Sequence, residues 1–157
     1  MDFCSIASGS SGNCTYTGTD HTALLVDAGV SARQIEKGLK SIDRTATDID
    51  GILVTHEHSD HIKGLGVLSR RYGIPIYGTK GTLNAIANCS SLGTIDAGLY
   101  REIHVDEDFQ VGDVTVHPFE IPHDAAQPSA YRISHEETSV AVVTDLGVFS
   151  DYIIENM

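Results

Sequence analysis

The sequence of 157 residues is short of cysteine, and it lacks any long apolar run. No stretch approaches the roughly 20 apolar residues that a membrane-spanning helix needs, so we expect no membrane association. Residues 1–5 contain neither the basic nor the apolar segment of a secretory signal peptide. The three cysteines are an odd number and show no metal-ligand pairing, which fits a reducing compartment better than a disulfide framework. We therefore expect a cytoplasmic protein.

Basic residues are also scarce: 10 Lys and Arg stand against 22 Asp and Glu, for a net charge of −12. The excess lies in residues 102–157, which hold twelve acidic residues and one basic residue, Arg132. An acidic chain is by itself a poor electrostatic match for nucleic acid, although bound divalent cations offset part of such charge. The imbalance counts mildly against a nuclease. Length and apolar content are those of one globular domain.

The apolar pattern predicts an α/β sandwich with mixed sheets. Residues 51–55 form a continuous apolar run, as expected of a strand buried on both faces. Ser31 is a candidate N-cap for a helix with apolar residues at Ile35, Leu39 and Ile42, which share one face. Further strands are expected at 3–7, 14–17, 22–27, 74–77, 114–119, 130–134 and 139–144, and further helices at 62–73, at 82–89 and after Asp145.

The strongest chemical signal follows the buried strand directly. His56, His58, Asp60 and His61 lie within six residues. In extended chain, His56 and His58 project to the same side, and as the chain turns into the next helix Asp60 and His61 can face a second centre. A solvated loop that happens to be rich in histidine is the alternative. Three imidazoles and a carboxylate so close together are more typical of a metal site, because histidine is the commonest metal ligand.

Two further candidate ligands come at the ends of later strands. His123 follows the strand expected at 114–119, and Asp145 follows the strand expected at 139–144. Functional side chains at the carboxyl ends of strands are common in layered α/β folds. Either residue alone would be a plain surface residue, but together with the cluster they become candidate ligands.

In its ligand order, His-x-His-x-Asp-His, then a lone His, then a lone Asp, the chain resembles the metallo-β-lactamase superfamily. It is most similar to the YycJ/WalJ-like hydrolases. The matching segments are ASGSSGN at 7–13, LLVDAG at 24–29, VTHEHSDHIKGLG at 54–66 and PHDAAQP at 122–128, with Thr144-Asp145 after them.

The resemblance implies an αββα sandwich and a site for two divalent metal ions, zinc or manganese. It implies that a metal-bridging hydroxide attacks a phosphodiester, most simply as a DNA exonuclease linked to DNA repair, with Asp60 orienting the water or taking its proton. A glyoxalase-II-like thioesterase is the alternative enzyme. The implied ligands are His56, His58 and His123 on the first metal, Asp60 and His61 on the second, and Asp145 bridging both, with Asp27 orienting a ligand.

One departure from the family concerns the second metal. The family ordinarily adds a histidine far downstream of the aspartate, whereas no histidine follows His135 here, and family members run on well beyond this length. We therefore expect residues 1–157 to be the N-terminal portion of the domain, with the C-terminal half missing and sheet edges exposed. The alternative to an enzyme is an inactive metal-binding fragment, and we expect weak or no activity from this chain.

The remaining candidates are weaker. Lys63, Arg70 and Arg71 could touch a phosphate backbone, but such residues are more often the solvated face of a helix. The loop at 9–13 could approach the site or bind an anion, and equally it could be a plain tight turn. The histidines interpreted as non-ligands are His21, His104, His117 and His135.

Overall fold

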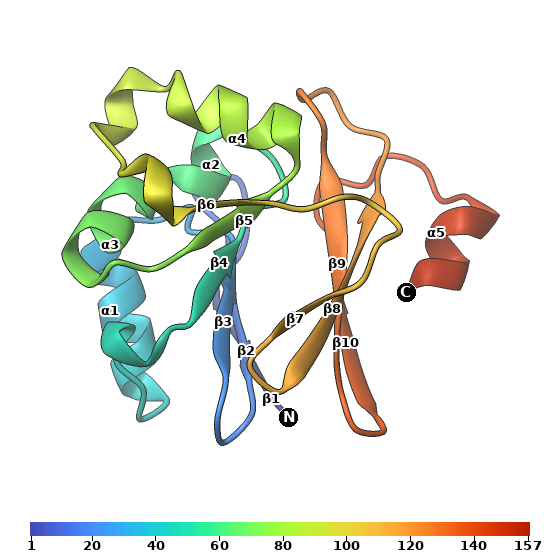
Figure 1. Ribbon diagram of the computed structural model, residues 1–157, viewed down its shortest axis with the longest axis horizontal. Coiled ribbons are helices and arrows are strands. Elements are labelled where there is room, and N and C mark those ends of the chain that lie inside the picture. Colours follow the sequence, from blue (N-terminus) through green and yellow to red (C-terminus); the bar gives the residue numbers. More distant parts are fainter.

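The computed structural model describes residues 1–157, which form two β-sheets packed face to face between layers of helices (Figure 1). Sheet A has the strand order β1-β2-β3-β4-β5-β6, and sheet B has the order β10-β9-β8-β7. The strands of sheet A are β1 (Asp2–Ala7), β2 (Cys14–Gly18), β3 (Ala23–Val26), β4 (Gly51–Leu53), β5 (Ile76–Gly78) and β6 (Tyr100–Glu102). Those of sheet B are β7 (Phe109–Val111), β8 (Val114–Glu120), β9 (Ser129–His135) and β10 (Thr138–Val142). The α-helices are α1 (Ala32–Ser41), α2 (Ser59–Ile62), α3 (Leu65–Tyr72), α4 (Lys80–Ala87) and α5 (Asp151–Asn156). Three short 3-10 helices complete the elements: η1 (Ala46–Asp48), η2 (Ser90–Leu92) and η3 (Ala97–Leu99).

Sheet A is mixed, as predicted. Strands β1, β2 and β3 pair antiparallel, and β3, β4, β5 and β6 pair parallel. The strands predicted at 14–17 and 22–27 are β2 and β3, and they pair as a hairpin. Sheet B is antiparallel throughout. Because β3 to β6 run in the same direction, their carboxyl ends lie at one edge of the sheet, where α/β folds usually carry functional groups.

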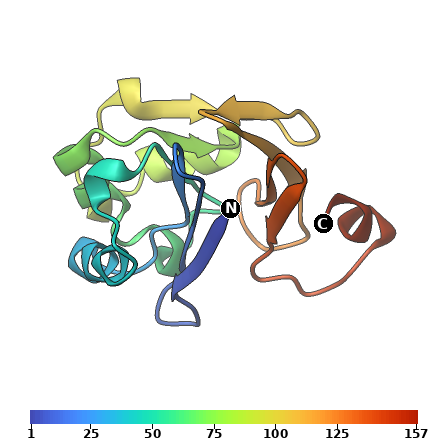
Figure 2. The same cartoon turned by 90° about the horizontal axis from the view of Figure 1, so that it is seen from below.

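Apolar side chains alternate between the two faces of sheet A, and this alternation builds the layers. Leu25 and Ile52 pack under α1, α3 and α4, whereas Leu24, Val26 and Leu53 pack against sheet B. Helix α5 covers the outer face of sheet B (Figure 2). Its one buried residue packs in the cluster of Phe119, Ile121, Ala130 and Ile153. The order of layers is therefore the αββα order predicted.

Helix α1 begins where the sequence predicted. The Ser31 hydroxyl accepts a hydrogen bond from the Gln34 backbone N–H at 3.2 Å, and the Gln34 side-chain oxygen accepts one from the Ser31 N–H at 3.2 Å. This reciprocal pair is a capping box, and it satisfies two N–H groups that a helix start leaves unpaired. Ile35 and Leu39 are fully buried on the sheet side of the helix.

The helix predicted at 62–73 is α3, which begins three residues later than predicted because the chain breaks at Gly64 between α2 and α3. The Gly64 N–H donates to the Ala28 carbonyl at 2.8 Å rather than to a helical partner. A Cβ at position 64 would lie 2.3 Å from the Val30 carbonyl oxygen, so only glycine permits this approach. Strand β5 begins at Ile76, two residues later than predicted, and β6 and β7 were not predicted.

The two edge strands on one side, β1 and β10, leave a cleft of about 260 Å³ between the sheets, lined in part by Phe3, Val26 and Val142. Phe3 is 54% exposed, and Val148 and Phe149 expose about two thirds of their surface. Exposed sheet edges were expected. None of the helices has the length and apolar character to cross a lipid bilayer.

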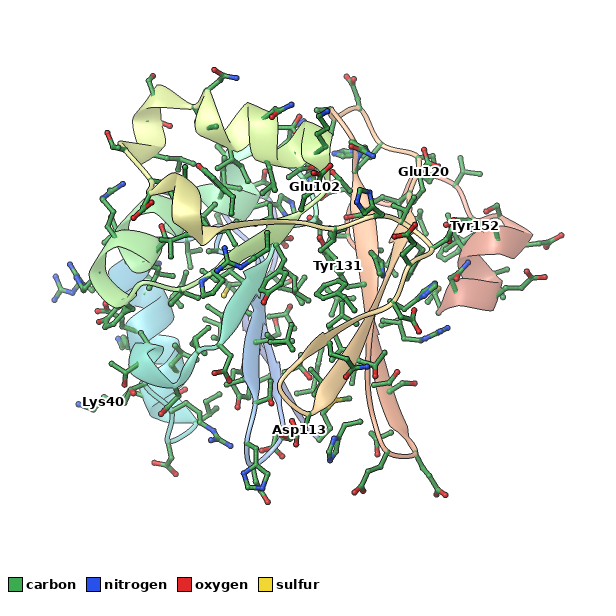
Figure 3. All side chains as sticks on the ribbon, viewed as in Figure 1. Lys40, Glu102, Asp113, Glu120, Tyr131 and Tyr152 are labelled. Carbon is green, nitrogen blue, oxygen red and sulfur yellow. The ribbon has the colours of Figure 1, made fainter.

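Tyr131 ties the two sheets together. Its ring is fully buried between them (Figure 3), and its hydroxyl, from sheet B, donates to the Val54 carbonyl at the end of β4 at 2.7 Å. Tyr16 offers a contrast, because it is also buried and its hydroxyl has no hydrogen-bond partner within the protein. On the outer side of sheet B, the Tyr152 hydroxyl donates to Asp106 and accepts from the Glu120 N–H, which fixes α5 (Figure 3).

We expect Tyr131→Phe to lower the free energy of unfolding by about 1–3 kcal/mol, because it removes a buried hydrogen bond while keeping the ring. Tyr16→Phe is the matched control: it removes a buried hydroxyl without a partner and should leave stability unchanged or raise it. Urea unfolding followed by circular dichroism measures both. Equal effects of the two variants would contradict the role given to the Tyr131 hydroxyl.

Candidate metal centre

The residues predicted as ligands converge at the carboxyl end of β4. His56 and His58 lie in the segment that leaves β4, and His61 lies on α2. His123 follows β8 and Asp145 follows β10, so both come from the sheet B layer. The structure therefore brings together side chains from three separated stretches of the sequence.

One group of donor atoms consists of His56, His58 and His123, whose donors all lie within 4.8 Å of one another. His58 Nδ1 and His123 Nε2 are 3.3 Å apart, and the ring centroids of His56 and His123 are 4.6 Å apart. His56 is buried, His123 is half-buried and His58 is exposed, so the group opens to solvent on one side. Three imidazole nitrogens at this spacing suit a tetrahedral cation such as zinc.

A second group shares His56 with the first and adds His61 and Asp145. Asp145 Oδ2 lies 2.8 Å from His61 Nε2 and 3.6 Å from His56 Nε2. The carboxylate thus belongs to the second group and adjoins the first through His56, the residue that the two groups share.

Asp60 lies beside these groups, without belonging to either set of converging donors. Its Oδ2 is 3.5 Å from His61 Nε2. Asp60 and Asp145 also line a cleft of about 430 Å³ together with Ser8, Ser10 and Asn13 from the loop after β1. That loop, expected either to approach the site or to be a plain turn, does approach it.

A buried carboxylate orients the histidines. Asp27, 1% exposed, accepts hydrogen bonds from the Thr55 N–H at 2.8 Å, the Thr55 hydroxyl at 2.8 Å and His61 Nδ1 at 2.6 Å. Because the Thr55 hydroxyl gives its one hydrogen to Asp27, it accepts from His56 Nδ1 at 2.9 Å. Both imidazoles therefore carry their hydrogen on Nδ1, and both leave the lone pair of Nε2 free toward the site.

Burial and charge shift the pKa values of these groups. Burial, followed by the neighbouring His61, lowers the pKa of His56 to about 3. Burial also lowers the pKa of His61, but its hydrogen bond to Asp27 and the nearby aspartates raise it, and the net shift is upward. Burial raises the pKa of the Asp27 carboxyl, and its hydrogen bonds with His61 and Thr55 oppose the rise.

The sequence pattern did not predict the role of Thr55 or the need for glycine at position 29. Thr55 is fully buried at the end of an apolar strand, and a polar residue in that place was the available signal. A Cβ at Gly29 would lie 1.7 Å from the Asp60 carbonyl oxygen, so the chain after Asp27 needs glycine to pass this loop. Asp27 and Asp145 both adopt left-handed backbone, with φ of 62° and 55°, a strain that is typical of functional positions.

None of the histidines interpreted as non-ligands joins a group of converging donors. His117 hydrogen-bonds Asp108 at 2.5 Å and Asn156 at 2.7 Å, and His135 Nδ1 donates to the Asp113 carbonyl at 2.9 Å. His21 and His104 are exposed.

Comparison with known proteins agrees with this geometry. The family described as "Beta-lactamase superfamily domain" matches residues 22–157. This chain belongs to the beta-lactamase superfamily. It is 43% identical over 151 residues to exodeoxyribonuclease YycJ of Bacillus anthracis, covering 96% of this chain and 56% of that protein. It is 42% identical over 154 residues to exodeoxyribonuclease WalJ of Streptococcus pneumoniae strain D39, covering 96% of this chain and 57% of that protein.

Solved structures confirm the metallo-β-lactamase fold. A B3 metallo-β-lactamase with an active-site glutamic acid superposes with a TM-score of 0.74 at 15% identity, over 89% of this chain and 57% of that one. The di-zinc B3 enzyme LRA-12 from an Alaskan soil metagenome superposes with a TM-score of 0.69 at 19% identity, over 83% and 56%. This chain thus spans a little over half the length of these relatives and of these solved structures.

We expect Thr55→Val to lower the free energy of unfolding of the metal-free protein by about 1–3 kcal/mol, because it leaves the buried His56 Nδ1–H without an acceptor. Thr55→Ser keeps the hydroxyl and should cost only about 0.8 kcal/mol for the lost methyl group. Urea unfolding in the presence of a chelator measures both. If the two variants lost the same stability, the hydroxyl would not serve this site.

Proposed function

We propose that this superfamily domain binds two divalent cations, zinc or manganese, and hydrolyses phosphodiesters of DNA. The observation that carries the proposal is the pair of donor groups sharing His56. Imidazole suits zinc and carboxylate suits manganese, so the mixed donor set fits either ion. We assign the first cation to His56, His58 and His123. We assign the second to His61 and Asp60, with Asp145 shared between the two.

Cations held there would lower the pKa of a coordinated water and neutralise charge on a phosphodiester. The protein's own part is orientation. Asp27 and Thr55 fix His56 and His61 so that Nε2 of each ring faces the site. The Asp60 carboxylate lines the cleft beside Asp145, and we assign it the task of orienting the attacking water and accepting its proton.

The cleft also supports a polar, extended substrate. Only one of its eight lining residues is hydrophobic, and Ser8 and Ser10 are among the polar ones. The basic residues of α3 are otherwise engaged: Arg70 donates to the carbonyls of Leu92 and Thr94, and Arg71 pairs with Glu36. We therefore assign phosphate recognition to the cations and the polar cleft.

DNA as the polymer is supported by the YycJ and WalJ relatives, which are named exodeoxyribonucleases. The three cysteines, all free, support a cytoplasmic location.

We expect the purified protein to bind two zinc ions per chain. His58→Ala removes a ligand assigned to the first cation only and should leave one ion, whereas Asp145→Ala removes the ligand assigned to both cations and should weaken both sites. His104→Ala, an exposed histidine outside the cluster, is the matched control and should retain two. Isothermal titration with zinc counts the ions. Two ions retained by Asp145→Ala would refute the shared arrangement.

We expect release of nucleotides from an end-labelled DNA duplex when manganese or zinc is added, at a low rate because no histidine follows His135. Asp60→Asn should lower that rate by a factor of about 10² to 10⁴, the range for a lost general base. Asp124→Asn, an exposed carboxylate, is the control.

Parallel assays with bis-p-nitrophenyl phosphate and a glutathione thioester decide the substrate class. Faster hydrolysis of the thioester would favour the glyoxalase-like alternative. Bound metal without hydrolysis of any substrate would favour the inactive metal-binding fragment.

A further inference from the structure

We propose that Glu57 is a positioning residue that holds His123 in place for the first cation. This inference rests on the proposed metal binding. It concerns the loop at residues 121–128, called here the His123 loop, which connects β8 to β9.

The His123 loop has little apolar packing of its own. Pro122, Asp124, Ala126 and Gln127 are exposed, and only the two ends of the loop are buried. Its base is closed by one long backbone hydrogen bond, 3.5 Å from the Ile121 N–H to the Pro128 carbonyl. A histidine on such a loop needs another restraint to stay 3.3 Å from His58.

Glu57 supplies that restraint from the opposite side of the motif. It stands between His56 and His58, and in extended chain its side chain projects away from their rings. The Glu57 Oε1 atom accepts a hydrogen bond from the Ala126 N–H at 2.9 Å, across 69 residues of sequence. A bond to a carboxylate is about twice as strong as one between neutral groups.

The second carboxylate oxygen of Glu57 is further evidence that the hydrogen bond to Ala126 matters. Oε2 is buried and has no hydrogen-bond partner within the protein. Burying half of a carboxylate unpaired costs free energy, so a neutral or smaller residue would suit this position better unless the bond to Ala126 mattered. The same short segment thus sets two ligands with its histidines and aligns a third through Glu57.

The far side of the loop is anchored independently at the start of α4. The Gln127 side-chain oxygen accepts from the Gly81 N–H at 2.9 Å, and the Gln127 carbonyl accepts from the Thr79 hydroxyl at 2.8 Å and the Thr82 hydroxyl at 3.2 Å. A Cβ on Gly81 would lie 2.7 Å from the Gln127 Cβ, so glycine permits this approach. The His123 loop belongs to the sheet B layer but is held by residues of the sheet A layer on both sides.

The test uses zinc alone as the probe, titrated against a competing chelator. We expect Glu57→Ala to weaken the zinc site containing His123 by about 10- to 100-fold, the usual effect of losing a group that orients a ligand. Glu57→Gln keeps an oxygen that can accept from Ala126 and should restore affinity to within about threefold of wild type. Asp124→Ala removes a nearby negative charge without removing a hydrogen bond and should change nothing.

Two readouts separate positioning from general stability. Cobalt substituted for zinc should show a changed visible spectrum in Glu57→Ala and a normal one in Glu57→Gln. In the wild type, the Ala126 amide should exchange its hydrogen more slowly than the Asp124 amide, a measurement that needs no variant to fold. An unprotected Ala126 amide, or equal zinc affinity of Glu57→Ala and wild type, would overturn the proposal. So would a Glu57→Gln variant as weak as Glu57→Ala. If the wild type bound no zinc, the proposed function itself would fail.

Discussion

The buried carboxylate of Asp27 is the constraint on which the site depends. A charge inside the protein must be matched by hydrogen-bond donors, and Asp27 finds three of them on Thr55 and His61. These bonds lock the end of β3 to the end of β4 and to α2. They also decide which nitrogen of His56 and His61 faces outward. Without them the same histidines would be present, but their rings would be free to turn.

The packing of the two sheets brings the remaining donors into place. His123 and Asp145 come from the layer of sheet B, and they meet the β4 segment because apolar side chains on the facing surfaces fix the distance between the sheets. Tyr131 makes the link direct by bonding the Val54 carbonyl two residues before His56. A site built from both layers is only as well ordered as the interface between them.

The uneven charge of the chain corresponds to the division between the two sheets. The acidic segment at residues 102–157 supplies sheet B and Asp145, while the basic residues of α3 are occupied by Glu36 and by backbone carbonyls. The protein surface therefore offers little attraction for a polyanion. Cations held among the histidines and aspartates would supply the positive charge that a phosphodiester needs at the point of cleavage.

The sequence alone determined the layers of the fold and the identity of the converging residues. The pattern of apolar residues predicted most strands, and Ser31 as an N-cap predicted the start of α1. The spacing of His56, His58, Asp60 and His61 at a strand end predicted the cluster. The break at Gly64 and the strand β6 depend on partners far along the chain, Ala28 and β5, which local pattern does not contain. For the same reason only the tertiary structure decided that Thr55 sets the histidine tautomers and that Glu57 meets Ala126. A hydrogen bond between residues 69 positions apart depends on how the layers pack. The sequence around either residue therefore does not predict it.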